Sequence, residues 1–366
     1  MKQITFRPHS VAALLPIEFA RPAERVVIDW GVLAATRFFL AFIVIQFHQF
    51  LYFQPNPFNA FMAQLGGKAA VVGFLVISGF SIHASLARQS EKFVARRLLR
   101  VYPAYIGSIL LSLFLQYRFP AYAAPQIVFE PNSLSVFACN AALLQMYACK
   151  AIAYDGVVWS LSIEFSFYIM VYLARRLPDR VFIALAMASL AVFCLPSDLS
   201  DSAGFHLLMR INAAKYLWAF LFGYLLFRRH TIRELVGLGA LSSFAFALSP
   251  ERSETLGPLT ILATFVMIAL ATRRRGLKSR VLNFLGDVSY PLYLVHLPLY
   301  IALGGFFGIA DALTLTLVAV LGAVLTLELV EKPFRRSLHR FGGMSRSLLK
   351  FAERTLLFKS YAASAI

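Results

Sequence analysis

The chain has 366 residues, of which 59% are hydrophobic and 14% charged, and its 35 phenylalanines exceed what a soluble core of this length needs. This composition excludes an ordinary soluble domain and predicts a polytopic membrane protein. The formal net charge of +17 suits orientation in a membrane and contact with anionic lipid or phosphate-bearing ligands. We therefore expect a lipid bilayer, and no nucleic acid, among the partners.

Residues 1–30 are polar and basic and are interrupted by Pro8, Pro16 and Pro22. They lack the uninterrupted apolar run and the small-residue cleavage site of a signal peptide. We expect this segment to be retained on the cytoplasmic side of the membrane.

Apolar windows near the length of about 20 residues needed to cross a bilayer then predict about ten membrane-spanning helices. The windows cover residues 31–51, 69–87, 101–117, 157–174, 181–196, 210–227, 235–249, 257–272, 283–303 and 311–330. We therefore predict an all-α membrane domain over residues 31–331.

The basic residues test this topology, because cytoplasmic loops carry an excess of Lys and Arg. With both termini in the cytoplasm, 28 of the 35 basic residues fall in the terminal segments and the cytoplasmic loops. Four fall in outer loops, and Arg37, Arg210 and Lys215 fall in helices. The distribution favours ten helices with both termini cytoplasmic.

The longest outer segment, residues 118–156, contains the apolar stretch SLSVFACNAALLQM. We interpret this stretch as a re-entrant or surface helix, because a full span would move every later loop to the other side. Cys139 and Cys149 lie in the same segment, where an oxidising compartment permits a disulfide. The sequence leaves open whether they form a bridge or remain two free apolar cysteines, and Cys194 is placed near the outer end of its helix.

The tail, residues 332–366, is basic and carries regularly spaced apolar residues. These are Leu348, Leu349, Phe351, Leu356 and Phe358. The pattern fits an amphipathic helix on the inner leaflet, and a frayed tail that only helps to orient the protein fits equally well. The sequence contains no metal-ligand spacing and no Gly-rich phosphate loop, so we expect no metal and no bound cofactor.

The first predicted helix contains an arginine and a histidine eleven residues apart, Arg37 and His48. This spacing is about three helical turns, so the side chains share one face and lie roughly 16 Å apart along the axis. Ionisable groups at membrane depth are costly and usually face a protein interior or a water-filled cavity. The pair therefore marks a functional site, with Arg37 in the inner half of the membrane and His48 near the outer face.

Glu164, in the segment WSLSIEFSFY, lies at a similar predicted depth to His48. A carboxylate beside an imidazole can set its tautomer and support its action as a general base. We therefore predict that Glu164 supports His48, and the alternative is a structural ion pair with Lys215 or Arg210.

The segment SYPLYLVHLP places His296 near mid-membrane, with Tyr290 and Tyr293 on the same side of the helix. A lone histidine in an apolar helix is more often a packing residue than a catalyst, and this alternative remains open for His296.

Arg96, Arg97 and Arg100 cluster at the predicted cytoplasmic mouth of the third helix. Guanidinium groups suit phosphate because they are planar, permanently charged and bidentate. Together with Arg37, they outline a basic path from the cytosol toward His48.

These residues occur within motifs that resemble the acyltransferase-3 family of membrane acyltransferases, and the motifs follow the family order along nearly the whole chain. They are Arg37 and His48 at an Arg-x10-His spacing, GFLVISGF (73–80), RRLLRVYPAY with Arg97 and Arg100, WSLSIEFSFY (159–168), LGDVSYPLYLVHLP (285–298) and VEKPF (330–334).

The resemblance implies transfer of an acyl group, usually acetyl, from cytosolic acyl-CoA to a hydroxyl of a glycan or glycolipid outside a bacterial cytoplasmic membrane. Acceptors in the family include exopolysaccharide, O-antigen and lipo-oligosaccharide. By the same resemblance His48 is the general base and Glu164 supports it, while the donor is bound by Arg37, Arg97 and Arg100. We expect no fused outer hydrolase-like domain, so the membrane unit either completes the transfer itself or hands its acyl group to a separate periplasmic partner that modifies the acceptor.

Direct attack of the activated hydroxyl on the thioester is the mechanism we favour, and an acyl-histidine intermediate remains open. The supporting candidates are Asn140, Trp159, Ser160, Tyr290, Tyr293 and His296. Two other functions fit the composition: a transporter or flippase for a glycolipid or small anion, and a catalytically inactive scaffold. Against the transporter, the polar positions do not repeat between the two halves of the sequence.

Overall fold

The computed structural model describes most of the chain. The described residues are 28–195, 212–228, 231–250, 252, 254–273 and 279–337. The expected N-terminal segment up to residue 27, Arg210 and the tail beyond residue 337 lie outside these ranges, so their predicted structures are not tested.

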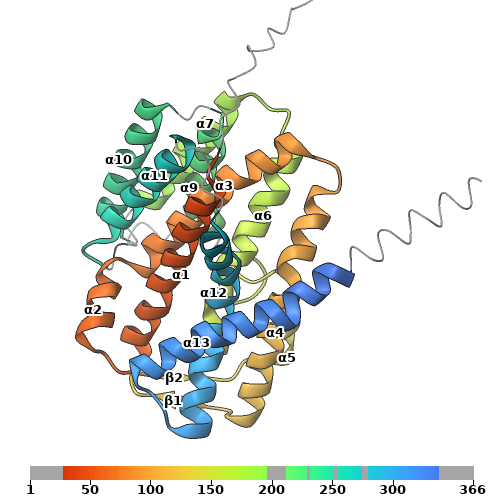
Figure 1. The fold of residues 1–366 in the computed structure, drawn as a ribbon, viewed down its shortest axis with the longest axis vertical. Helices are drawn as coiled ribbons and strands as arrows, with labels where there is room; N and C mark the ends of the chain where they lie inside the picture. The colour runs from red at the N-terminus through yellow and green to blue at the C-terminus, as the bar shows by residue number, and fades with distance from the viewer. Residues whose placement is uncertain are drawn as a thin grey trace, which may run out of the picture.

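A helix occupies each of the ten predicted spans (Figure 1). They are α1 (Trp30–Tyr52), α3 (Gly67–Arg88), α4 (Phe93–Arg118), α6 (Trp159–Ala174), α7 (Asp179–Cys194), α9 (Asn212–Leu226), α10 (Ile232–Leu248), α11 (Gly257–Arg273), α12 (Arg280–Phe307) and α13 (Ala312–Thr326). Within the described residues, six helical stretches are long and apolar enough to cross a membrane. They are Trp30–Tyr52, Gly67–Arg88, Phe93–Arg118, Ala153–Ala174, Arg280–Phe307 and Ala312–Ser337. The number of spans and the side on which the termini lie stay predictions.

Several of these helices begin at a side chain that accepts hydrogen bonds from the free N–H groups of the first turn. Asp29 accepts from Gly31 and Val32 at the start of α1, at 3.0 and 3.2 Å. Asp311 accepts from the Thr314 N–H at the start of α13, and this bond holds the pKa of the Asp311 carboxyl below its ordinary value. The helix boundaries are thus set locally, by residues that the sequence places just before each apolar run.

The segment predicted to lie outside the membrane forms a small layer at one end of the helices. It contains β1 (Tyr122–Ala124), β2 (Ile127–Phe129), α5 (Leu134–Ala141) and the 3₁₀ helix η1 (Ala153–Val158), and the two strands pair antiparallel. Figure 1 shows β1, β2, α5 and the short α2 (Pro57–Gln64) at the same end. The apolar stretch around α5 is therefore a short helix, as expected, and the hairpin is an exception to the all-α prediction.

A disulfide joins Cys139 and Cys149, which decides between the two alternatives that the sequence left open. The bridge closes the loop that follows α5, and Cys194 is free. The loop is thereby tied to the end of α5 before the chain continues into η1.

Close helix contacts depend on glycines. A Cβ atom added at Gly79 of α3 would lie 1.9 Å from the backbone oxygen of Phe220 in α9, and one added at Gly223 would lie 1.9 Å from the oxygen of Val76. Small residues of this kind let helix backbones approach closely where lipid cannot drive association. Gly286 of α12 packs in the same way against Ala34 of α1, which brings together the helices that carry His296 and His48.

The last helix contains a local change of pitch. After α13 the chain makes a π-helical turn, η3 (Leu327–Glu331), and then continues as a helix to residue 337. Such turns insert an extra residue and rotate the following side chains relative to an unbroken α-helix. Figure 1 shows α13 crossing the molecule obliquely toward α4.

Replacement of Gly79 by alanine is expected to destabilise the protein by about 1–3 kcal/mol, because the methyl group has no space unless α3 and α9 separate. Thermal unfolding in detergent, followed by circular dichroism, measures the effect. Gly107→Ala in α4 is the matched control, because nothing lies within 4 Å of an added Cβ there. Equal stability of the two variants would contradict the close packing.

Candidate functional site

Arginines from three parts of the chain surround one cavity, which we call the arginine cavity. Its charged and tyrosyl lining residues are Arg37, Arg97, Arg100, Glu164, Tyr168, Asp287, Tyr290, Tyr293, Glu331 and Arg335. The structure therefore brings together Arg37, Arg97 and Arg100, which the sequence predicts to act together.

Two of the arginines contact neutral side chains that do not line the cavity. Arg37 on α1 donates from Nη2 to the hydroxyl of Ser81 on α3 at 3.0 Å. Arg97 on α4 lies over the ring of Phe93, with its guanidinium carbon 5.6 Å from the ring centroid. Among the described residues, neither guanidinium forms a direct ion pair, although Glu164 lines the same cavity.

Glu164 lies in the arginine cavity and not beside His48. Its carboxylate accepts hydrogen bonds from the hydroxyls of Ser78 on α3 and Tyr168, one turn further along α6. The predicted support of His48 by Glu164 is therefore wrong as a direct contact. The side chain of Glu164 points instead to Ser78 on α3, in the cavity that contains Arg37.

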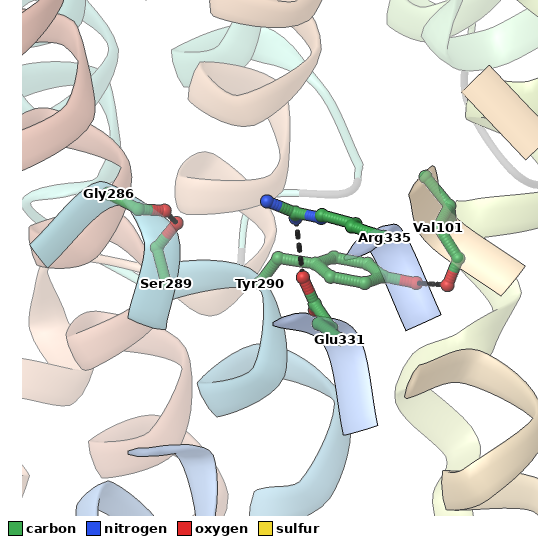
Figure 2. A network of polar contacts seen from close by, with 6 residues as sticks. All are labelled: Val101, Gly286, Ser289, Tyr290, Glu331 and Arg335. Carbon is green, nitrogen blue, oxygen red and sulfur yellow. Dashed lines mark hydrogen bonds and ion pairs between the residues drawn. The ribbon is translucent and has the colours of Figure 1, made fainter. Parts of the chain in front are cut away.

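A second set of contacts lies in the lining of the arginine cavity (Figure 2), and it includes Glu331 and Arg335, which the sequence did not single out as site residues. Tyr290 of α12 donates to the carbonyl of Val101 at 2.8 Å, and Arg335 donates from Nη2 to the carboxylate of Glu331 at 2.5 Å. Glu331 is 1% exposed, whereas Arg335 is 35% exposed. The motif VEKPF contains Glu331, but no sequence pattern predicts the π-turn η3 that ends at Glu331.

His48 lies in a second cavity, which we call the histidine cavity. Its walls come from α1, β2, η1, α6 and α12. The lining residues are His48, Tyr52, Ile127, Val128, Phe129, Ala153, Gly156, Val157, Trp159 and Leu297. Of the supporting candidates, Trp159 is thus placed with His48.

His296 is in direct contact with His48. Nδ1 of His48 lies 3.0 Å from Nε2 of His296, and the rings stack with centroids 5.1 Å apart. His296 is completely buried. It is therefore more than a packing residue of α12, since it is a hydrogen-bond partner of the histidine on α1.

Hydrogen bonds link the linings of the two cavities. The hydroxyls of Ser160 and Tyr293, which both line the arginine cavity, lie 2.8 Å apart. The Tyr293 hydroxyl also donates to the carbonyl of Val157 at 3.0 Å, and Val157 lines the histidine cavity. Tyr293 thus links the arginine cavity to a residue that lines the histidine cavity, and Ser160 is its hydrogen-bond partner.

Asn140 has a different position. Its buried amide donates to the carbonyls of Val136 and Lys150 at 2.8 and 2.9 Å and accepts from the Ile152 N–H. These bonds satisfy the backbone of the disulfide loop, and Asn140 lines neither cavity. Within the described ranges, no group of three or more His, Cys, Asp or Glu residues is arranged to hold a metal ion.

The sequence profile of the acyltransferase domain matches residues 32–329, which include every lining residue of the two cavities except Glu331 and Arg335. The chain belongs to the acyltransferase-3 family. It is also 26% identical over 252 residues to ORF330 of Acidianus two-tailed virus, whose name gives it provisionally as an acetyltransferase; the match covers 63% of this chain and 72% of the viral protein. No solved structure matches the chain. As an acyltransferase-3 protein with several helices able to span a bilayer, it is a multi-pass membrane protein.

Glu164→Gln in this acyltransferase-3 protein is expected to cost about 1–3 kcal/mol, because the amide keeps one oxygen acceptor but loses the charge-assisted bonds to Ser78 and Tyr168. Thermal unfolding of the purified protein checks this. Glu130→Gln, on the exposed outer segment, is the control and should remain within about 0.5 kcal/mol of wild type. A Glu164 variant as stable as the control would show that the carboxylate is not held as described.

Proposed function

We propose that this acyltransferase-3 protein moves an acyl group, most simply acetyl, from cytosolic acyl-CoA to a hydroxyl of a surface glycan or glycolipid. Exopolysaccharide, O-antigen and lipo-oligosaccharide are acceptors of this class. The observation that carries the proposal is the pair of cavities, one rich in arginine and one containing His48, whose linings are linked by the hydrogen bond from Tyr293 to Val157.

The arginine cavity suits the donor. Arg37, Arg97 and Arg100 present permanent positive charges, which bind phosphate oxygens well. Arg335 adds a fourth guanidinium, and its Nε has no hydrogen-bond partner among the described residues. In our proposal the phosphates of acyl-CoA bind these groups. When no donor is bound, the carboxylates of Glu164 and Glu331 offset part of the positive charge of the four arginines.

The histidine cavity suits the acceptor. Beside His48 its lining is aromatic or aliphatic, with Tyr52, Phe129 and Trp159 as its aromatic members. This lining fits an uncharged hydroxyl-bearing group better than a phosphate, because an anion buried there would find no positive side chain in the lining.

The reaction we propose is a direct transfer. The acceptor oxygen forms a bond to the thioester carbonyl carbon while His48 takes the hydroxyl proton. The carbon–sulfur bond then breaks, and the CoA thiolate takes that proton back from His48. Tyr293 and Ser160 lie in the lining of the arginine cavity, and their hydroxyls are our candidates to donate to the carbonyl oxygen in the transition state.

The orientation belongs to the same proposal. We propose ten spans, both termini in the cytoplasm and residence in a bacterial cytoplasmic membrane, so that the arginine cavity faces the donor and the histidine cavity faces the acceptor. Single cysteines introduced at exposed Arg176 and at exposed Glu130 in a Cys194→Ser background test this with a membrane-impermeant thiol reagent. Only the Glu130 position should react in intact cells, and the reverse pattern would overturn the orientation.

Transfer itself is tested with purified protein, labelled acetyl-CoA and a panel of glycans. His48→Ala is expected to lower kcat by about 10²–10⁴-fold, the usual contribution of a general base. Full activity of this variant would overturn the assignment. A labelled acyl group retained on the wild-type protein would favour the acyl-histidine route, and the absence of any CoA binding would favour the transporter.

Donor binding is tested by replacing Arg97 and Arg100 together with alanine. We expect KM for acetyl-CoA to rise by about tenfold or more, because each charge-assisted bond to phosphate contributes about 1.5–3 kcal/mol. Arg176→Ala, an exposed arginine outside the cavity lining, is the control and should leave KM unchanged. An unchanged KM in the double variant would place the donor elsewhere.

The acceptor is identified by mass analysis of surface glycans from a deletion strain, with and without the restored gene. We expect a loss of one acyl mass per modified unit that returns with the wild-type protein. If the restored gene returns acylation in cells but the purified protein does not acylate purified glycan in vitro, a separate periplasmic partner is required.

A further inference from the structure

We propose that His296 is a positioning residue that holds His48 in the one tautomer able to act as a base toward the histidine cavity. The inference rests on the proposed function for its chemical consequence. Its geometric part concerns which ring nitrogen of each histidine carries a proton, and this part stands on the contacts of α1 and α12 alone.

The proton on His296 is placed by its own helix. Nδ1 of His296 lies 3.1 Å from the carbonyl oxygen of Leu292, one turn earlier on α12. A carbonyl oxygen only accepts, so Nδ1 of His296 carries the hydrogen. A neutral imidazole has one N–H and one bare nitrogen, and Nε2 of His296 is therefore an acceptor.

The proton on His48 follows from this assignment. Nδ1 of His48 lies 3.0 Å from Nε2 of His296, and a contact of this length between two ring nitrogens needs one hydrogen. Since Nε2 of His296 is bare, Nδ1 of His48 donates. Nε2 of His48 is left unprotonated, as the hydrogen-bond network assigns it.

The packing holds both rings in this arrangement. His48 stacks between His296, at 5.1 Å, and Tyr52, at 5.5 Å. The edge of Tyr300 contacts His296 with centroids 5.6 Å apart, and the Tyr300 hydroxyl accepts a hydrogen bond from Gln49 at 2.9 Å. A ring flip of His296 would lose the bonds to both Leu292 and His48, so the direction of the network is over-determined.

The partner of the base is a neutral imidazole and not a carboxylate. The other titratable groups in ring contact with the pair are the tyrosines Tyr52, Tyr293 and Tyr300. When the acceptor hydroxyl gives its proton to Nε2 of His48, the resulting imidazolium still donates from Nδ1 to His296. His296 thus shares the positive charge while the C–O bond forms, and the proton returns through Nε2 to the thiolate when the C–S bond breaks. A neutral partner avoids a permanently buried charge, which is costly at this depth.

The first test replaces His296. His296→Leu removes the acceptor for Nδ1 of His48, and we expect kcat to fall by about 100-fold with little change in KM for acetyl-CoA, because the donor cavity is not lined by His296. His296→Gln keeps an oxygen acceptor near the position of Nε2 and should recover kcat to within about tenfold of wild type. Full activity of the leucine variant, or no recovery with glutamine in a folded protein, would overturn the positioning role.

A matched control is available in His83, a buried histidine of α3 whose Nδ1 lies 2.7 Å from the Tyr224 carbonyl and which lines neither cavity. His83→Gln and His83→Leu should leave kcat unchanged. A loss of kcat in the His83→Leu variant as large as that in His296→Leu would show that any buried histidine has this effect, and would overturn the inference.

The second test measures the tautomer directly and needs no glycan substrate. Nitrogen-15 NMR of the histidine-labelled protein in nanodiscs resolves protonated from bare ring nitrogens, and His48→Ala identifies the signals of His48 among the seven histidines. We expect a protonated Nδ1 and a bare Nε2 on His48, with the opposite tautomer becoming populated in His296→Leu. A protonated Nε2 in the wild type would overturn the inference. If the wild type transfers no acyl group at all, the proposed function fails, and the NMR result still decides whether His296 sets the tautomer.

Discussion

The cost of keeping polar groups inside an apolar helix bundle is the constraint on which the rest of this structure depends. A buried charge or imidazole without a partner costs several kcal/mol, so each must be bonded or must face a cavity. Arg37 meets this requirement through Ser81 and the arginine cavity, Glu164 through two hydroxyls, and His48 through His296. The partners come from different helices, so the polar groups also fix which helix faces meet.

The close helix contacts make this arrangement possible. Glycine contacts hold α3 against α9 and α12 against α1, and the second of these brings the two histidines within hydrogen-bonding distance. The same α12 carries Tyr290 and Tyr293 into the lining of the arginine cavity, and Tyr293 bonds the Val157 carbonyl. One helix thus contributes both to the arginine cavity and to the partner of the proposed base.

The sequence predicted the helical segments well, because hydropathy depends only on the order of residues, and the ten windows each contain a helix. It also predicted that Arg37, Arg97 and Arg100 outline one basic path, and in the structure all three line the arginine cavity. Its error was Glu164. Depth follows from the count of residues along a helix, at about 1.5 Å each, but the direction of a side chain around the axis follows from how that helix packs.

By itself, the sequence determined the membrane class, the approximate helix positions and the family motifs, since these depend on composition and spacing along the chain. The limits were less exact, because α4 begins at Phe93, eight residues before the predicted span. Only the tertiary structure decided that Cys139 bonds Cys149, that Glu164 belongs with the arginines, that the π-turn η3 precedes Arg335 at the donor cavity and that His296 is the partner of His48. Each of these pairs joins residues through space. Their distances are set by packing and by local changes in helix rotation that no one-dimensional pattern records.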